Sequence, residues 1–200
     1  MTHEDPQLLR AVAALKAGGV AIFPTETVYG IAVAVTCAQS PEALYALKRR
    51  DRGKPIAWLV SDASALDTYG ADVPDFAYTL ARAFWPGPLT LIVQAARAVP
   101  PAFCSSGGTI GLRMPDCAIS LELLARVGVP LATTSANFAG GEAAKTFNEL
   151  DSALLESVDA AIDGAIVSSG VASTIIDCTQ GYPVMVRQGG ISLEAVKALV

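Results

Sequence analysis

The chain has 200 residues and a formal net charge of −5 at pH 7, with 52% hydrophobic and 16% charged residues. This length suits one domain with a substantial core, and the apolar composition excludes a mainly disordered chain. The longest apolar runs, such as 31–35 and 89–93, are too short to cross a bilayer, and the polar start of the chain does not look like a secretory signal. We therefore expect a cytoplasmic protein without membrane contact.

The cysteines give no sign of a metal centre. Cys37, Cys104, Cys117 and Cys178 form no Cys-x-x-Cys pair, and the single histidine, His3, stands near the N-terminus. The usual ligand spacings of a metal site are therefore missing. Buried or inert thiols in a reducing compartment are the expected state.

Apolar periodicity and turn residues predict alternating helices and strands along the chain. Asp5-Pro6 begins a first helix that stops at Gly18-Gly19. The alternation predicts an α/β fold, with one domain over residues 1–200 and an open mixed sheet flanked by helices. Strands are predicted at 20–23, 31–35, 55–60, 89–94, 109–113, 130–133, 159–162, 173–177 and 183–188, and further helices at 41–47, 74–85, 116–127, from Thr146 and after Ser192.

The common nucleotide and hydrolase motifs are missing. The chain has no GxxxxGK[ST] loop, no strand-linked GxGxxG and no GxSxG elbow, so a nucleotide would have to be held in another way. Polar residues instead gather at the predicted strand ends, where ligands of open α/β sheets usually bind. These groups lie at 25–29, 48–54, 109, 113, 133–137, 173–174 and 187.

A basic cluster stands out against the overall acidity. Lys48, Arg49, Arg50, Arg52 and Lys54 place five of the 14 lysines and arginines within seven positions. Combined with hydroxyls and one amide, and without an obvious carboxylate dyad, these cations suit the binding of a polyanion and the orientation of a small polar molecule. Phosphoryl or nucleotidyl transfer, commonly with a divalent ion on the phosphates, is the chemistry that they favour.

Each of these features also has an ordinary structural explanation. The basic cluster ends a predicted helix and complements its dipole, and Thr or Ser residues at strand ends often form caps or turns. Arg113 and Arg187 are also consistent with surface ion pairs, and Asn137 with a left-handed turn. The case for a site rests on the occurrence of these residues together.

Seven segments, in a fixed order over about residues 20–190, give the chain a resemblance to the Sua5/YrdC/YciO family. They cover nearly the whole chain. The segments are Pro24–Gly30, Lys48–Arg50 with Lys54-Pro55, Trp85–Thr90, Gly111–Pro115, Thr134–Asn137, Ser173–Asp177 and Arg187–Gly189.

The resemblance implies a twisted, open mixed sheet with a concave, positively charged face. It also implies an ATP- and Mg²⁺-dependent reaction in which L-threonine and bicarbonate form a carbamate that attacks the α-phosphorus of ATP. The products are L-threonylcarbamoyladenylate and diphosphate, and a separate transferase complex then uses the adenylate to modify an adenosine of tRNA. The chain resembles the short bacterial members, without a second C-terminal domain.

The resemblance also implies a division of the site. Lys48 and Arg50 would act on the reacting groups, and no residue would bind a metal directly. Arg113 would pair with the threonine carboxylate, because an arginine can donate two parallel hydrogen bonds. ATP would contact Arg50, Lys54, Thr109, Ser135, Asn137 and Arg187, and threonine would contact Thr25, Tyr29, Arg113, Thr133 and Ser173.

Two positions depart from the family pattern. Leu59 or a neighbour stands where many members carry a histidine, and the segment 143–146 reads Ala-Ala-Lys-Thr where members often have Ser-Pro-Thr. These walls of the site are therefore the least determined.

Two other functions compete with the synthase. A non-catalytic module for double-stranded RNA or tRNA fits the basic cluster, but the acidic chain with 6% aromatic residues provides little for stacking or counterion release. A weak RNA contact remains compatible with the sequence. A YciO-like paralogue of different activity is disfavoured by the segments 25–29, 85–88 and 135–137, whose patterns such members lack.

Overall fold

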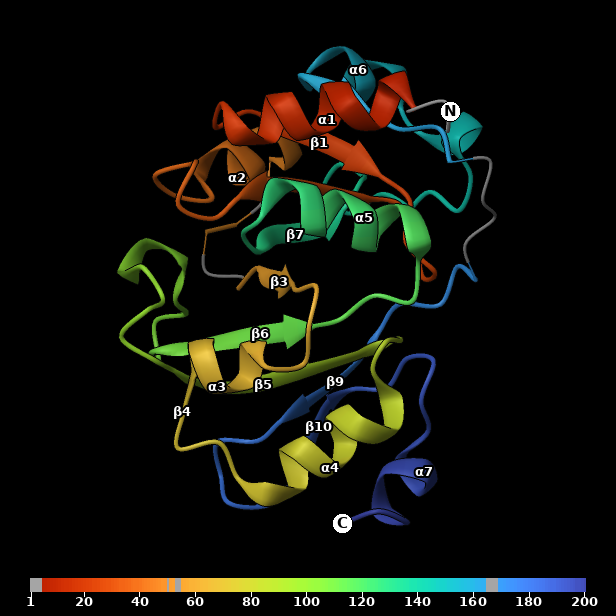
Figure 1. Ribbon diagram of the computed structural model, residues 1–200. Helices are drawn as coiled ribbons and strands as arrows, with labels where there is room; N and C mark the ends of the chain where they lie inside the picture. The colour runs from red at the N-terminus through yellow and green to blue at the C-terminus, as the bar shows by residue number, and fades with distance from the viewer. Residues whose placement is uncertain (1–4, 50, 53–54, 165–168) are drawn as a thin grey trace.

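The computed structural model describes residues 5–49, 51–52, 55–164 and 169–200. Within these residues every strand belongs to one sheet, and helices pack on both of its faces (Figure 1). The strands are β1 (Val20–Phe23), β2 (Gly30–Ala34), β3 (Ala57–Leu59), β4 (Gly70–Ala71), β5 (Leu89–Ala95), β6 (Thr109–Arg113), β7 (Leu131–Ser135), β8 (Ala160–Ala161), β9 (Thr174–Asp177) and β10 (Val184–Arg187).

The helices connect these strands, together with two short 3-10 turns. They are α1 (Pro6–Lys16), α2 (Glu42–Lys48), α3 (Ala65–Tyr69), α4 (Asp75–Phe84), α5 (Ala118–Val127), α6 (Ser152–Glu156) and α7 (Leu193–Lys197), with the turns η1 (Pro101–Phe103) and η2 (Phe147–Glu149).

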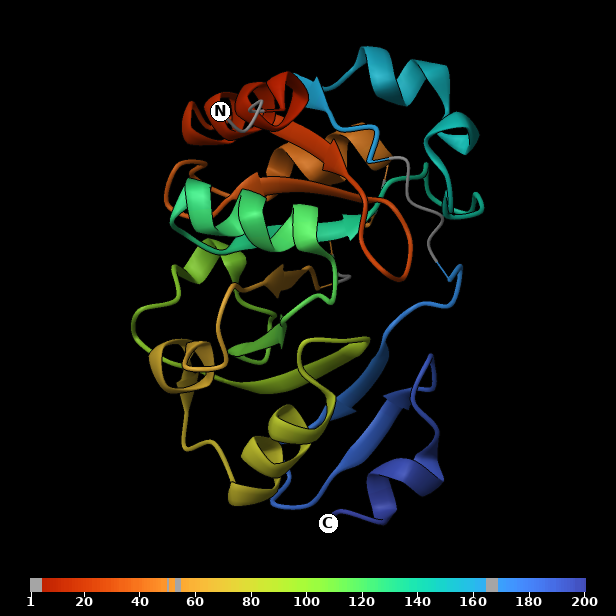
Figure 2. The ribbon, with the colours of Figure 1, turned by 45° about the vertical axis from the view of Figure 1, so that its right-hand side comes forward.

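The sheet is mixed and open, as the sequence predicts. Its strand order is β10-β9-β5-β6-β3-β7-β2-β1-β8, with β4 paired to β5. The pairs β1/β8, β3/β6 and β5/β9 are parallel, whereas the other neighbours are antiparallel. Figures 1 and 2 show the sheet running from β1, beside α1, to β9 and β10, beside α7.

Helices α1 and α5 cover one face of the sheet only in part. Because side chains alternate along a strand, paired residues share a face, and Leu59, Leu131 and Ala34 lie side by side across β3, β7 and β2. They pack in one apolar cluster with Leu123 and Leu124 of α5. The strand residues of this cluster come from β1, β2, β7 and the end of β3, so the same face of β6, β5 and β9 lies outside it.

The opposite face carries the larger core, to which α2, α3, α4, α6 and α7 all contribute. Its largest fully buried side chain is Trp58 of β3. The rings of Tyr69 and Phe103 meet Trp58 edge-on, with ring centroids 5.3 and 5.9 Å away. These aromatic rings pack against the centre of the sheet, on the face opposite to α1 and α5.

Most of the predicted elements are confirmed, and β6 matches its predicted bounds at both ends. The end signals also work as expected at two helices. Asp5 accepts a hydrogen bond from the Gln7 N–H at 2.8 Å to cap α1, and Ser192 accepts one from the Ala195 N–H at 3.1 Å to cap α7. The short elements α3, β4 and η1 have no strong periodic signal and were not predicted from the sequence.

The helix predicted to begin at Thr146 is wrong. The segment forms only the single turn η2, and Thr146 makes no capping hydrogen bond with its side chain. The Glu149 carboxylate accepts from the Lys145 N–H at 2.8 Å and also interacts with Thr146, yet the chain does not continue as a helix after η2. The next helix, α6, begins only after Asp151, which caps it.

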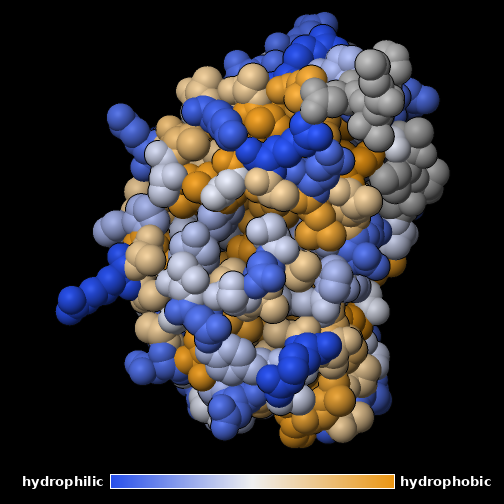
Figure 3. All heavy atoms as spheres, in the orientation of Figure 1, coloured by the Kyte–Doolittle hydropathy of each residue, from blue (hydrophilic) through white to orange (hydrophobic). Residues whose placement is uncertain are grey.

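No helix in the described part of the chain is long and apolar enough to cross a membrane. On the face seen in Figure 3, hydrophilic and apolar side chains are interspersed, and residues of intermediate hydropathy cross its middle.

Candidate functional site

A pocket of about 300 Å³ opens on the face of the sheet that α1 and α5 cover only in part, beside their apolar cluster. Thr133 of β7 and Ala57 of β3 are direct neighbours in its floor. The pocket is lined by Thr25, Thr27, Val28, Tyr29, Gly30, Pro55, Ala57, Leu59, Thr90, Arg113, Thr133, Thr134, Ser135, Ala143, Gly170, Ala172, Ser173, Ile175 and Arg187.

Arg113, the last residue of β6, is the most enclosed cation of this lining, with 8% of its surface exposed. Its Nη2 donates a hydrogen bond to Thr27 Oγ1 at 2.9 Å and lies 2.7 Å from Oε1 of Glu26. Its Nε donates to the carbonyl of Gly87 at 3.3 Å. These contacts come from the β1–β2 loop and from the Pro-Gly-Pro turn, so two loops orient the guanidinium.

Arg187, at the end of β10, is held by Ser173, the residue that precedes β9. Its Nε and Nη2 donate to the carbonyl of Ser173 at 3.1 and 2.8 Å, and the Ser173 hydroxyl is 2.9 Å from that of Thr90. Burial lowers the pKa of Arg187 below its ordinary value, and the positive charge of Arg113 lowers it further. The two guanidiniums therefore lie close enough for their positive charges to interact.

The β1–β2 loop forms one wall of the pocket. The Thr25 hydroxyl donates to the Val28 carbonyl at 2.6 Å and lies 2.9 Å from the Thr27 hydroxyl. The Gly170 N–H donates to the Thr27 carbonyl at 2.8 Å, which ties the loop to a segment far along the chain. Tyr29 follows as a fully buried wall residue, and burial raises its pKa.

The β7 side of the pocket depends on a glycine. Gly30 pairs with Ser135 across the two strands, and a Cβ at Gly30 would lie only 2.9 Å from Cγ2 of Thr133. The absence of a side chain lets Thr133 fill this part of the wall. The Thr133 hydroxyl donates to the Leu131 carbonyl at 2.8 Å.

Lys48 and Asn137 lie outside the pocket lining, although the sequence suggested that both contact the substrates. Lys48 is 3% exposed, and its Nζ donates to the Ser135 carbonyl and to the Asn137 carbonyl at 2.6 Å. The Asn137 side chain donates to the Phe138 and Gly141 carbonyls. Lys48 thus joins α2 to the end of β7, where Ser135 lines the pocket, and to the turn that follows.

Thr109 is also outside the lining, at the far end of β6 from Arg113. The two residues share a face, but four steps along a strand separate them by roughly 13 Å. The Thr109 hydroxyl lies 2.7 Å from that of Ser105. Arg50 and Lys54 are outside the described residues.

Seven of the site residues suggested by the sequence therefore meet in one pocket. They are Thr25, Tyr29, Arg113, Thr133, Ser135, Ser173 and Arg187, and the two uncertain walls, Leu59 and Ala143, join them. The roles of these residues toward ligands remain predictions.

The sequence reasoning missed Glu26, Thr27 and Thr90 as members of the site. All three occur within the quoted segments 24–30 and 85–90, so their motifs were noticed without their contacts. Only the folded chain shows that Thr27 and Glu26 face Arg113 and that Thr90 contacts Ser173.

The pocket can bind an anion and orient a small polar ligand. Two guanidiniums supply charge, and its hydroxyls can donate or accept hydrogen bonds. Within the described residues, no group of three or more His, Cys, Asp or Glu side chains is placed to hold a metal ion.

The model of the family Sua5_yciO_yrdC, described as telomere recombination, matches residues 13–189. The chain belongs to this family. A relative from Bacillus subtilis (strain 168), named threonylcarbamoyl-AMP synthase, is 33% identical over 201 residues, which cover 100% of this chain and 58% of the relative. A relative from Mycobacterium leprae (strain TN), named putative threonylcarbamoyl-AMP synthase, is 37% identical over 186 residues, covering 93% of this chain and 84% of the relative.

Solved structures agree on the fold of the Sua5_yciO_yrdC family. The crystal structure of Pyrococcus abyssi Sua5 complexed with L-threonine superposes with a TM-score of 0.90 at 31% identity, covering 96% of this chain and 57% of that one. The α/β fold with an open mixed sheet is thus shared. This chain spans less than two thirds of the length of the B. subtilis and P. abyssi relatives.

Proposed function

We propose that this protein is an L-threonylcarbamoyladenylate synthase, which converts ATP, L-threonine and bicarbonate into threonylcarbamoyl-AMP and diphosphate. The observation that carries the proposal is the pairing of Arg113 and Arg187 in one small, hydroxyl-lined pocket. The names of the relatives and the threonine complex of the P. abyssi protein support the same reaction.

On the threonine side, Arg113 receives the substrate carboxylate. Its Nε and Nη2 are already bonded to the protein, so the guanidinium is oriented before a ligand arrives. The hydroxyls of Thr25, Thr133 and Ser173 surround the remaining volume and suit the ammonium and hydroxyl of threonine.

On the ATP side, Ser135 and Arg187 of the pocket lining would contact the nucleotide. A volume of about 300 Å³ is at the lower end of the range for small-molecule sites, roughly 300–1,000 Å³. It suits an amino acid with part of a triphosphate, so the nucleotide extends beyond the pocket. We expect Asn137 and Lys48 to act by holding the turn that positions Ser135, and Arg50 and Lys54 to serve the triphosphate.

The reaction needs little acid–base chemistry from side chains. The threonine ammonium first loses a proton to solvent. Its nitrogen then bonds to the carbon of bicarbonate, and the bicarbonate hydroxyl leaves as water with a second proton from that nitrogen. A carbamate oxygen next attacks the α-phosphorus of ATP while the bond from that phosphorus to diphosphate breaks. The two guanidiniums stabilise the anionic groups and hold them together. Mg²⁺, which we expect to enter with ATP, supplies charge neutralisation on the phosphates when bound.

The adenylate product is reactive and must be consumed by a group-transfer step. We propose that a tRNA threonylcarbamoyl-transferase complex in the cytoplasm accepts it. A weak contact with RNA near the basic cluster is part of this proposal.

The test is a synthesis assay. The protein is incubated with ATP, Mg²⁺, L-threonine and labelled bicarbonate, and we expect diphosphate release that depends on threonine together with labelled threonylcarbamoyl-AMP. Serine and valine replace threonine in matched reactions to show which part of the side chain is recognised. Absence of product, where a known synthase makes it under the same conditions, would contradict the proposed function.

A further inference from the structure

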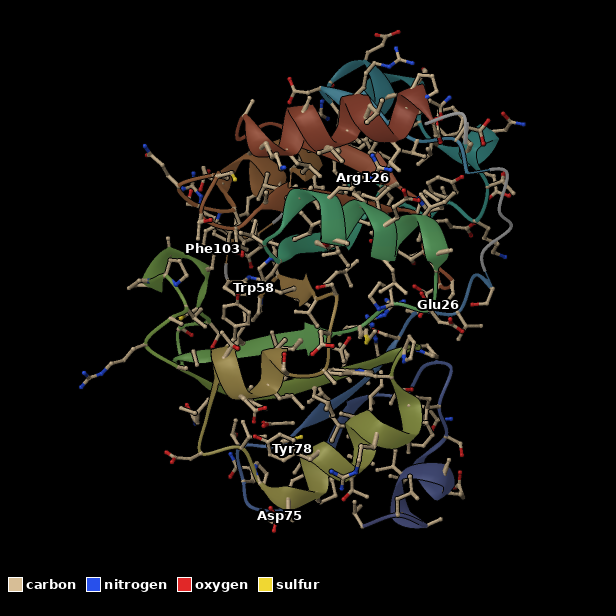
Figure 4. All side chains as sticks on the ribbon, viewed as in Figure 1. Glu26, Trp58, Asp75, Tyr78, Phe103 and Arg126 are labelled. Carbon is tan, nitrogen blue, oxygen red and sulfur yellow. The ribbon has the colours of Figure 1, made fainter. Side chains whose placement is uncertain are left out.

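Glu26 is a buried acid for which the proposed reaction has so far no use. It lies in the β1–β2 loop, and its carboxylate oxygens are each exposed by less than 1 Å². Figure 4 shows Glu26 on the side of the molecule away from Trp58 and Phe103. A carboxylate so enclosed loses much of its hydration, so its presence needs a compensating partner.

That partner is Arg113. Oε1 of Glu26 lies 2.7 Å from Nη2 of Arg113, and the two side chains are 20% and 10% exposed. Within the described residues, neither carboxylate oxygen has a hydrogen-bond partner of good geometry, although Nη2 of Arg113 is the nearest cationic atom. The interaction of Glu26 is therefore an attraction between charges, and it is directed at Arg113.

The contacts of Arg113 divide its guanidinium nitrogens into two that face the protein and one that is left for a ligand. Nη2 faces Glu26 and Thr27, and Nε faces the Gly87 carbonyl. Nη1 has no partner among the described residues, and it belongs to the residue that lines the pocket. Glu26 itself is not part of the lining, so it meets a ligand only through Arg113.

Glu26 also balances the charge of the pocket. Arg113 and Arg187 are close enough that one lowers the pKa of the other. Like charges in a partly buried space repel, and an adjacent carboxylate reduces that repulsion. With Glu26 in place, both guanidiniums can face the same ligand.

We propose that Glu26 is a positioning residue for the substrate carboxylate: it fixes the guanidinium of Arg113 so that Nη1 faces the pocket. The inference rests on the proposed function, because it assumes that Arg113 binds the carboxylate of an amino acid. It predicts that the charge of Glu26 sets the affinity for threonine and leaves the affinity for ATP unchanged.

The experiment is a double-mutant cycle read by calorimetric binding of L-threonine and, separately, of Mg·ATP. Glu26→Gln keeps the shape of the side chain and removes its charge, and we expect about tenfold weaker threonine binding with ATP binding within about twofold. Glu122→Gln, which removes an exposed ion pair with Arg126 on α5, is the matched control and should change neither.

The cycle separates action through Arg113 from a general structural effect. If Glu26 works only through Arg113, then Glu26→Gln added to Arg113→Met should weaken threonine binding no further than Arg113→Met alone. Additive losses in the double variant, or an unchanged threonine affinity in Glu26→Gln, would overturn the inference.

A second variant and the behaviour of the wild-type protein keep the test decisive. Should Glu26→Gln fail to fold by circular dichroism, Glu26→Asp keeps the charge but withdraws it by one methylene, and it carries the same expectation of weaker threonine and unchanged ATP binding. If the wild-type protein binds threonine but makes no adenylate, the proposed function fails while the role of Glu26 can still be measured. If it binds no threonine, the inference falls with the assignment of Arg113.

Discussion

Leu131 and Thr133 stand two residues apart on the same face of β7, yet Leu131 lies in the apolar core and Thr133 in the wall of the pocket. Leu131 pairs with Ala34 and Leu59 and lies fully buried under α5, whereas Thr133 pairs with Ala32 and Ala57 and lines the pocket. A spacing of two residues along the strand, roughly 7 Å, thus separates the apolar core from the pocket. The strand is continuous, so the boundary reflects what packs on it: Leu131 belongs to the apolar cluster with Leu123 and Leu124 of α5, whereas Thr133 lines the pocket.

Different contacts hold the half of this face that α5 covers and the open half that lines the pocket. In the covered half, leucines meet leucines of α5 and gain from burial. In the open half, the residues are held by hydrogen bonds to backbone groups, as Thr133 is to Leu131 and Arg187 to Ser173. Substitutions should therefore affect stability in one half and ligand binding in the other.

Leu131→Ala should give the largest effect, on stability. Removing a fully buried leucine should lower the free energy of unfolding by about 2–5 kcal/mol, measured by urea denaturation with an unchanged slope. Leu9→Ala, at an exposed position on α1, serves as the control and should cost less than about 1 kcal/mol. A small loss at Leu131 would show that the covered half is not a packed core.

Arg113→Ala should give the largest effect on binding. We expect threonine affinity to fall about 100-fold, because a charge-assisted contact is removed and Glu26 is left without its partner. ATP affinity should change by less than about threefold. Isothermal calorimetry with each ligand measures both, and Arg126→Ala is the control on the exposed side of α5. A larger loss for ATP than for threonine would reverse our assignment of the pocket.

Thr133→Val tests the open half at the position that matches Leu131. Valine keeps the shape and removes the hydroxyl, so we expect about tenfold weaker threonine binding. The free energy of unfolding should change by less than about 1.5 kcal/mol, since a single hydrogen bond to the Leu131 carbonyl is lost. Stability is measured by the same urea titration. A loss as large as that of Leu131→Ala would erase the contrast between the two residues.

The smallest effect that we predict is on the reactivity of the Cys178 thiol, just beyond β9. Burial raises the pKa of its thiol to about 12, so the thiol is neutral at pH 8 and should resist alkylation by iodoacetamide. Cys37 is exposed and should react. Because the folded state favours the protonated thiol, its contribution to stability is complete below the ordinary pKa and is lost as the pH rises toward about 12. Mass spectrometry after a timed reaction tests the contrast, and equal labelling would contradict it.

Much of the fold could be predicted from the residues themselves. The Asp5 and Ser192 caps, the apolar run of β1 and the full extent of β6 were recognisable because each signal lies within a few neighbouring residues. The failure at Thr146 has the same origin. Its capping pattern is local and correct in spacing, and Glu149 does interact with the residues at the start of the pattern, but the helix does not follow.

The candidate site divides in a similar way. The residue types of Arg113, Arg187 and the β1–β2 loop pointed to anion binding, and the resemblance to known proteins assigned them to threonine and ATP. The location of Thr109 could not be read in the same manner. It shares a motif and a face with Arg113, but the length of the strand takes it out of the pocket.

The residues alone predict most of the helices and strands, the residue types available for the chemistry, and the resemblance to the family. The folded chain alone shows that Lys48 holds the turn after β7, that Glu26 faces Arg113, and that Leu131 packs with α5 while Thr133 lines the pocket. The reason is physical: caps and periodicity act over a few residues, whereas these contacts join residues 87 apart in the chain, as Glu26 and Arg113 are, and Lys48 and Ser135 likewise. Such pairs meet only after the whole sheet has set its strand order.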